Sequence, residues 1–277
     1  MTDHYAVVGN PVAHSLSPQI HAEFARQTGQ DLDYVRLLAS LDGFTATVIQ
    51  FRDAGGKGIN VTLPFKLEAW NFVTAHSGHA LDAGAVNTID FRDGTTVGHN
   101  TDGKGLTRDL EQNLQFSIAG KRVLLMGAGG AAQGVLSPLM EQAPALLVIA
   151  NRTEAKAEHL VRIFCERKGP LRTLEWCSYS RLAGQTFDLA INATAASLAG
   201  DLPPLPASVF APNSLAYDVM YGKDATPFMQ YARAHGAARV ADGLGMLVEQ
   251  AAESFFIWRN VRPQTVPVIA MLKKREG

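Results

Sequence analysis

A run of small residues after an apolar strand constrains this chain more than any other feature. The segment KRVLLMGAGG (121–130) is typical of a β-strand that ends in a glycine turn, and AAQGVLSPLMEQA (131–143) is typical of a helix. Gly127, Gly129 and Ala132 occupy the small-residue positions of G-x-G-x-x-G/A, a pattern that lets the backbone approach a pyrophosphate at a helix start. Because LLVIANR follows as a second strand, we predict a Rossmann-type dinucleotide site, with a plain glycine turn as the alternative.

The end of that second strand indicates which dinucleotide is bound. Asn151, Arg152 and Thr153 stand where an NAD enzyme usually carries an acid that bonds the ribose 2′-hydroxyl. An arginine suits a 2′-phosphate instead, and Lys156 adds a second positive charge. The alternative is that both side chains are solvated charges at a helix start. The sequence therefore favours NADP over NAD.

Strand-like and helix-like runs alternate in the first part of the chain, from YAVVG (5–9) to GINVTLP (58–64). This alternation predicts an α/β fold with a mostly parallel sheet, and 277 residues are enough for two domains. Pro138 should bend or interrupt its predicted helix unless packing compensates. DLPPLPASVFAPN (201–213) is expected to be an ordered loop, and the chain after residue 245 to be helical.

The composition narrows the class of ligand. A net charge of −1 and a pI near 6.7 leave no basic stripe for nucleic acid, so we expect a small-molecule substrate. Without an apolar run of ~20 residues or a signal peptide, we expect no membrane span and a cytoplasmic location. Cys165 and Cys177 have the spacing of neither a redox pair nor a metal site, so we expect reduced, structural thiols and no metal.

Four polar stretches precede the glycine turn: GNPVAHSLSPQIH (9–21), NVTLPFK (60–66), GAVNT (84–88) and GHNTDGKG (98–105). Each has a structural explanation by itself. Ser15 and Ser17 could cap a helix, Asn87 could form a turn, Asp102 could cap the next helix, and Lys66 could be a solvated lysine. Together they lie near strand ends and helix starts, where open α/β sheets bind ligands.

In order and spacing, these motifs closely resemble those of shikimate dehydrogenases over nearly the whole chain. The family pattern G-x-P-x-x-H-S-x-S-P-x-x-H is met from Gly9 to His21, N-V-T-x-P-x-K at 60–66, G-A-V-N-T at 84–88 and N-T-D-x-x-G at 100–105. The second half matches G-A-G-G-A, N-R-T, N-A-T (192–194), D-x-x-Y (218–221) and G-L-x-M-L-x-x-Q-A (243–251). Two departures are AASLAG (195–200), in place of a Ser- or Pro-containing glycine turn, and Leu16, where many members have a basic residue.

The resemblance implies a reversible hydride transfer between NADPH and 3-dehydroshikimate that gives shikimate, on the route to aromatic amino acids. It implies a substrate-binding domain of residues 1–104 plus 244–277, a Rossmann domain of residues 105–243, and an active site in the cleft between them. The implied catalytic pair is Lys66 and Asp102. The implied substrate-binding residues are Ser15, Ser17, Asn60, Thr62, Asn87, Tyr221 and Gln250. The implied cofactor-binding residues are Gly127, Ala128, Gly129, Gly130, Ala131, Asn151, Arg152, Thr153, Lys156, Thr194, Met220, Gly243 and Met246.

The catalytic pair has a chemical reason. Hydride delivery to a ketone leaves an alkoxide, which an ammonium can stabilise and protonate while a neighbouring carboxylate fixes its position. Two alternatives stay open: a quinate/shikimate dehydrogenase that also uses NAD, and a non-catalytic NADP-binding sensor, which would be expected to lack Lys66 or Asp102. The oligomeric state is expected to be a monomer or a homodimer.

Overall fold

The structure, a computed structural model, describes residues 2–92, 94–194, 196 and 201–276. The chain divides into two compact units: unit 1 comprises residues 1–105 and 247–274, and unit 2 comprises residues 106–246 with 275–277. Most of the AASLAG departure, namely residues 195 and 197–200, lies outside the described residues. Within the described ranges, no helix has the length and apolar character needed to cross a membrane.

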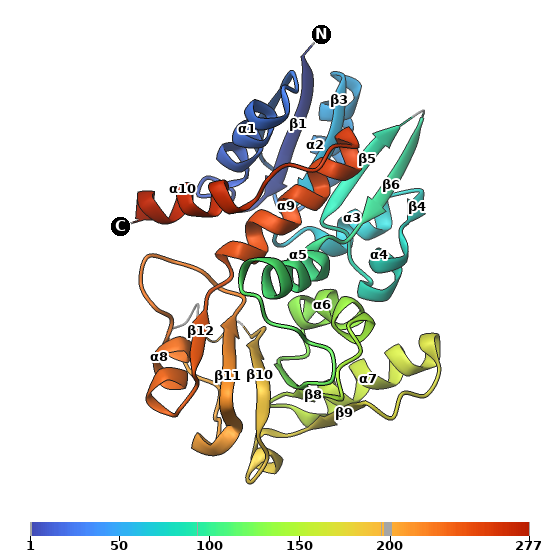
Figure 1. Ribbon diagram of the computed structural model, residues 1–277. Coiled ribbons are helices and arrows are strands. Elements are labelled where there is room, and N and C mark those ends of the chain that lie inside the picture. Colours follow the sequence, from blue (N-terminus) through green and yellow to red (C-terminus); the bar gives the residue numbers. More distant parts are fainter. Residues whose placement is uncertain (1, 93, 195, 197–200, 277) are drawn as a thin grey trace. The chain divides into compact units, whose positions relative to one another are not determined.

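Unit 1 is built on a mixed sheet, which has six strands among the described residues (Figure 1). In order across the sheet, these are β2 (Leu32–Leu38), β1 (Asp3–Gly9), β3 (Gly56–Val61), β5 (Thr88–Arg92), β6 (Thr95–His99) and β4 (Ala75–His76). β1 pairs in parallel with β2 and β3, as the alternation of elements predicts. β5 runs antiparallel to β3 and to β6, which begins only three residues after β5 ends.

The helices of unit 1 come from both ends of the chain. They are α1 (Ser17–Thr28), α2 (Phe44–Asp53), α3 (Lys66–Phe72), α4 (Gly78–Ala83), the greater part of α9 (Leu244–Arg259) and most of α10 (Val266–Glu276). In Figure 1 the red helices α9 and α10 lie beside the blue α1 and β1. Trp258 of α9 packs against Gly58, where a Cβ would lie 2.3 Å from the indole nitrogen, and donates a hydrogen bond to the Ile89 carbonyl. The C-terminal segment thereby covers β3 and β5.

Unit 2 is a Rossmann-type domain, as predicted. Its sheet, within the described part of the chain, has the order β12 (Arg239–Ala241), β11 (Phe210–Asp218), β10 (Phe187–Asn192), β7 (Arg122–Met126), β8 (Leu146–Ala150) and β9 (Leu174–Cys177). All of these strands pair in parallel. The order reverses between β7 and β10, the position where doubly wound sheets bind nucleotides. Its helices are α5 (Asp102–Arg108, which begins in unit 1), α6 (Gly130–Glu141), α7 (Glu154–Lys168) and α8 (Pro227–Ala234).

Two prolines behave differently from the simplest expectation. Helix α6 continues as one element through Pro138, whose burial provides the packing that compensates for the missing N–H. The predicted loop over 201–213 is wrong at its end, because β11 begins at Phe210. Pro212 and Asn213, whose φ is 65°, fall in a register shift of the β10–β11 pairing, and this irregularity accommodates a proline within the strand.

Both cysteines are free thiols. Cys177 is buried at the end of β9, and burial raises the pKa of its thiol. This agrees with the predicted structural role. No group of three or more His, Cys, Asp or Glu side chains within the described ranges is arranged to bind a metal ion.

Candidate active site

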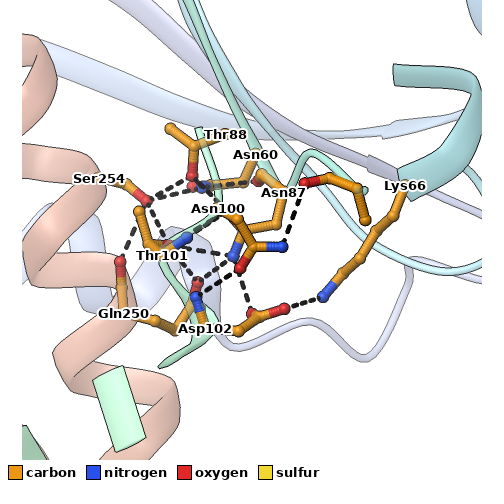
Figure 2. A network of polar contacts seen from close by, with 10 residues as sticks. Asn60, Lys66, Asn87, Thr88, Asn100, Thr101, Asp102, Gln250 and Ser254 are labelled. Atoms are coloured by element: carbon orange, nitrogen blue, oxygen red, sulfur yellow. Dashed lines mark hydrogen bonds and ion pairs between the residues drawn. The ribbon is translucent and has the colours of Figure 1, made fainter. Parts of the chain in front are cut away.

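The structure brings Lys66 and Asp102 together within unit 1. Lys66 is the first residue of α3, just after β3, and Asp102 is the first residue of α5, just after β6. Lys66 Nζ lies 2.5 Å from Asp102 Oδ2, and the two side chains are 29% and 14% exposed (Figure 2). Among the described residues, no other group accepts a hydrogen bond from this ammonium. Two of its three N–H donors therefore remain available to a substrate.

Asn87 holds the carboxylate of Asp102 from the other side. Its Oδ1 accepts a hydrogen bond from the Thr101 backbone N–H at 2.9 Å, and its Nδ2 donates to Asp102 Oδ1 at 2.8 Å. A backbone N–H can only donate and an ionised carboxylate can only accept, so the chemistry of the partners fixes which amide atom is which. Asn100 Oδ1 accepts the Asp102 N–H at 3.1 Å. The capping partner here is therefore Asn100, and both oxygens of Asp102 serve the site.

Asn60 is buried behind this pair, with 7% of its surface exposed. Its Oδ1 accepts from the Tyr34 hydroxyl at 2.7 Å, and its Nδ2 donates to Thr88 Oγ1 at 3.0 Å and Ser254 Oγ at 2.9 Å. Both N–H donors of this amide and one lone pair of its oxygen are thus engaged within the protein. Figure 2 shows Asn60, Thr88 and Ser254 grouped on one side of Asn87.

Gln250 completes the cluster from helix α9. Its Oε1 accepts hydrogen bonds from Asn87 Nδ2 at 3.3 Å and from Thr101 Oγ1 at 3.2 Å. The Nε2 group of Gln250 takes no part in these two bonds. Ser254 follows Gln250 by one helical turn, and its hydroxyl donates to the Gln250 carbonyl at 3.1 Å. Thr88, Thr101 and Ser254 also belong to the cluster, although no role was predicted for them from the sequence. The four-residue spacing from Gln250, which places Ser254 on the same helix face, was the available signal.

Ser15 and Ser17 lie at the start of α1. The Ser15 hydroxyl donates to Ser17 Oγ at 3.2 Å and accepts the Ser17 N–H at 3.3 Å. The N-cap position itself is Leu16, which makes no side-chain cap hydrogen bond. Thr62 packs against Gly9, where a Cβ would lie 2.4 Å from the Thr62 methyl group, and its hydroxyl has no hydrogen-bond partner among the described residues. Helix capping thus accounts for the bond that the Ser15 hydroxyl accepts from the Ser17 N–H. It accounts for no bond of the Ser17 or Thr62 hydroxyl.

The remaining predicted residues belong to unit 2, Tyr221 among them, in the segment between β11 and α8. The glycine turn follows β7. Gly127 has a φ of 105°, and a Cβ there would lie 3.0 Å from the Ala193 carbonyl oxygen, so glycine is required. Gly129 and Gly130 instead face open space, and α6 begins at Gly130 without a side-chain cap. Uncapped N–H groups at an open helix start suit an anion such as a pyrophosphate.

A second open helix start follows β8. Asn151 Nδ2 donates to the Thr153 carbonyl at 2.9 Å, and Thr153, the N-cap of α7, makes no side-chain cap hydrogen bond. Arg152 and Lys156 are exposed, and in the described part of the chain neither side chain has a hydrogen-bond partner. Burial raises the pKa of the Tyr179 phenol to about 12, an effect that the nearby Arg152 opposes. Two unpaired cations next to a helix start can bind a phosphate.

Other segments of unit 2 end at the same edge of its sheet. Thr194, after β10, donates through its hydroxyl to Asn192 Oδ1 at 2.7 Å. The Gly243 N–H, after β12, donates to the Met220 carbonyl at 3.0 Å. A Cβ on Gly243 would lie 2.1 Å from the Val219 carbonyl oxygen, so this approach requires glycine. Met246 follows, half-buried, in the first turn of α9.

Three family models match successive parts of the chain. The substrate-binding domain of shikimate dehydrogenase matches residues 7–89. The shikimate/quinate 5-dehydrogenase model matches residues 109–199, and the C-terminal domain of shikimate 5′-dehydrogenase matches residues 243–272.

Individual proteins are similar over the full length. The shikimate dehydrogenase (NADP(+)) of Nitrosospira multiformis is 59% identical over 100% of this chain and 99% of that protein. The crystal structure of an Ael1 enzyme from Pseudomonas putida has 50% identity and a TM-score of 0.93 over 98% of each chain. The shikimate 5-dehydrogenase of Thermus thermophilus, solved in complex with NADP(H) and shikimate, has 30% identity and a TM-score of 0.86 over 100% of both chains. This chain therefore belongs to the shikimate dehydrogenase family.

Proposed function

We propose that the protein is an NADP-dependent shikimate dehydrogenase, which reversibly reduces 3-dehydroshikimate to shikimate in the biosynthesis of aromatic amino acids. The observation that carries this proposal is the Lys66–Asp102 pair, with an Nζ–Oδ2 distance of 2.5 Å, at the starts of the helices that follow β3 and β6 in unit 1. Membership of the family and the names of its relatives give the substrate.

Lys66 acts as the acid and base in this mechanism. During reduction, negative charge develops on the substrate carbonyl oxygen, and the ammonium stabilises this charge and then donates a proton to the oxygen. In the reverse direction, Lys66 accepts that proton. Asp102 keeps Nζ in place by its charge, and the Asn87 amide keeps Asp102 in place. The pair therefore supplies both electrostatic stabilisation and proton transfer at one oxygen.

The substrate is a carboxylate with several hydroxyl groups, and the polar side chains of unit 1 match it. We assign its carboxylate to the hydroxyls of Ser15 and Ser17, and its ring hydroxyls to the amides of Asn87 and Gln250. The unpartnered hydroxyl of Thr62 provides a further contact, and Tyr221 contributes one from unit 2. Asn60 is also assigned to this lining, and its amide bonds Tyr34, Thr88 and Ser254.

The segments after the strands of unit 2 fit NADP. The open turn of Gly127, Ala128, Gly129, Gly130 and Ala131 leaves room for a pyrophosphate at the uncapped start of α6. We assign the 2′-phosphate to Arg152 and Lys156 with Asn151 and Thr153, and the rest of the pocket to Thr194, Met220, Gly243 and Met246. NADPH, when bound, supplies the hydride.

The two alternatives are weaker on specific grounds. A quinate/shikimate dehydrogenase that uses NAD would be expected to carry an acid where this chain has the exposed Arg152. A non-catalytic sensor would have no need of an ammonium paired with a carboxylate, and here both side chains are present and in contact. We further propose a cytoplasmic location, which the two free thiols support, and a monomeric or homodimeric state.

The test is an absorbance assay of nicotinamide reduction by the purified protein with shikimate and NADP, repeated with quinate and with NAD. We expect turnover with shikimate and NADP, and much lower kcat/KM in the other combinations. Lys66→Ala should lower kcat by about 10²- to 10⁴-fold. The matched control is Lys57→Ala, because Lys57 is an exposed lysine at the opposite end of β3. No turnover of shikimate, or equal rates for the two lysine variants, would refute the proposal.

A further inference from the structure

A continuous series of hydrogen bonds runs behind the candidate active site. It begins at the Tyr34 hydroxyl on β2, which donates to Asn60 Oδ1 at 2.7 Å. Asn60 Nδ2 donates to Thr88 Oγ1 at 3.0 Å, and the Thr88 hydroxyl donates to Asn87 Oδ1 at 3.0 Å. Asn87 Nδ2 then donates to Asp102 Oδ1 at 2.8 Å. The intermediate groups of this series are buried.

The direction of every bond in the series follows from the carboxylate of Asp102 at its end. An ionised carboxylate accepts only, so Asn87 must present its NH₂ group to Asp102 and its oxygen to Thr88. The Thr88 hydroxyl has one proton. When it donates this proton to Asn87, it accepts from the NH₂ group of Asn60, whose oxygen faces Tyr34. All donors then point toward Asp102, and bonds aligned in this way strengthen one another.

Tyr34 is built to remain a donor. Burial raises the pKa of its phenol well above the usual value, an effect that the nearby Ser17 hydroxyl opposes, so the phenol keeps its proton. The His21 ring stacks on it at 4.2 Å with an interplanar angle of 4°. This stacking holds the ring of Tyr34 in the orientation that directs its hydroxyl to Asn60.

We propose that Tyr34 and Thr88 are positioning residues, which fix the amides of Asn60 and Asn87 and, through them, the carboxylate of Asp102 beside Lys66. Asn60 is then an interior member of this series. The inference rests on the proposed function, because it assigns these residues a part in the same reaction.

The test compares substitutions that remove one hydroxyl each. Tyr34→Phe and Thr88→Val should each lower kcat for shikimate about three- to tenfold, the effect of one lost hydrogen bond, and leave KM for NADP unchanged. Thr88→Ser keeps the hydroxyl and should stay within about twofold of the wild type. The matched control is Tyr5→Phe, since Tyr5 is also buried and belongs to the same aromatic cluster, but its hydroxyl contacts Arg259.

The double variant Tyr34→Phe/Thr88→Val separates a connected series from two independent sites. If both residues act through one series, the double variant should lose clearly less than the product of the two single losses. Full multiplication of the losses would overturn the inference, as would a Tyr34→Phe enzyme whose kcat equals that of Tyr5→Phe. A purely structural role would lower the unfolding temperature without changing kcat per folded molecule, and that result would also overturn it. A wild type inactive on shikimate with NADP would instead refute the proposed function, and this inference with it.

Discussion

Histidine 21 should make the stability of unit 1 depend strongly on pH. Its side chain is 1% exposed, and neither ring nitrogen has a hydrogen-bond partner in the described part of the chain. Burial lowers the pKa of His21 from 6.5 to about 3; the Asn60 amide, which lies near the ring without the geometry of a hydrogen bond, opposes this shift. The imidazole is therefore neutral in the folded protein.

The sign and size of the effect follow from proton linkage. Between pH 6.5 and about 3, the unfolded chain binds a proton at His21 that the folded chain does not, so stability falls as the pH falls. Each pH unit in this window costs about 1.4 kcal/mol, so that about 2 to 3 kcal/mol is lost between pH 8 and pH 4.5. This is a substantial part of the ~5 to 15 kcal/mol that stabilises a typical protein.

The assay is urea denaturation at pH 8 and pH 4.5, followed by tryptophan fluorescence. Trp258 lies 5.5 Å from the His21 ring and reports on this unit, and a Trp176→Phe background removes the tryptophan of unit 2. His21→Phe keeps an aromatic ring but cannot be protonated, so it should lose about 2 to 3 kcal/mol less than the wild type between the two pH values.

The control variant is His14→Asn, because the side chain of His14 is exposed to water in the folded protein as well. This variant should follow the wild type. Equal losses for the wild type and His21→Phe would show that His21 is protonated in the folded protein, and would refute the argument from burial.

The remaining predictions concern the proposed site. Asp102→Asn should lose most of the activity while NADP still binds, because an amide lacks the charge that holds the Lys66 ammonium. Steady-state kinetics and NADP titration test this prediction. A variant with the kcat of the wild type would show that Asp102 has only a structural role. Ser15→Ala and Ser17→Ala should each weaken shikimate binding by about 1 to 3 kcal/mol, which raises KM for shikimate roughly 5- to 150-fold and leaves KM for NADP unchanged. A loss of thermal stability without a change in KM would make both serines structural. Arg152→Ala should raise KM for NADP about ten- to a hundredfold and leave KM for NAD nearly unchanged at low salt. Equal losses for the two cofactors would contradict the assignment of a 2′-phosphate to this residue.

The sequence was sufficient for the parts of the structure that local patterns determine. The small residues from Gly127 to Ala132 between a strand and a helix predict the Rossmann-type unit, because few other conformations need that pattern. Lys66 and Asp102 were expected as a pair only because their motifs, N-V-T-x-P-x-K and N-T-D-x-x-G, resemble those of shikimate dehydrogenases, and the structure places the two side chains in contact. The antiparallel β5–β6 hairpin was not predicted, although an Asp-Gly dipeptide at 93–94 is a common hairpin signal.

The buried polar series could not be read from the sequence for a physical reason. Tyr34 and Asn60 are 26 residues apart, and a tyrosine in an apolar strand has the pattern of an ordinary core aromatic. Its hydroxyl gains a role only when β2, β1 and β3 pair in register and remove both side chains from water. In the same way, the β-bulge that admits Pro212 depends on the partner strand β10, which composition does not report.

The division of unit 1 between two distant segments has a consequence for how the chain folds during synthesis. Residues 106–246 emerge from the ribosome as one uninterrupted unit, whereas residues 1–105 lack their partners on α9 until about 150 residues later. At a translation rate of about 5 to 20 residues per second, this delay lasts roughly 7 to 30 s. During that time Asn60 has no Ser254 to bond and Gly58 is not covered by Trp258. The N-terminal segment therefore begins synthesis first but completes its fold last, and it is the part of the nascent chain most exposed to chaperones and to aggregation.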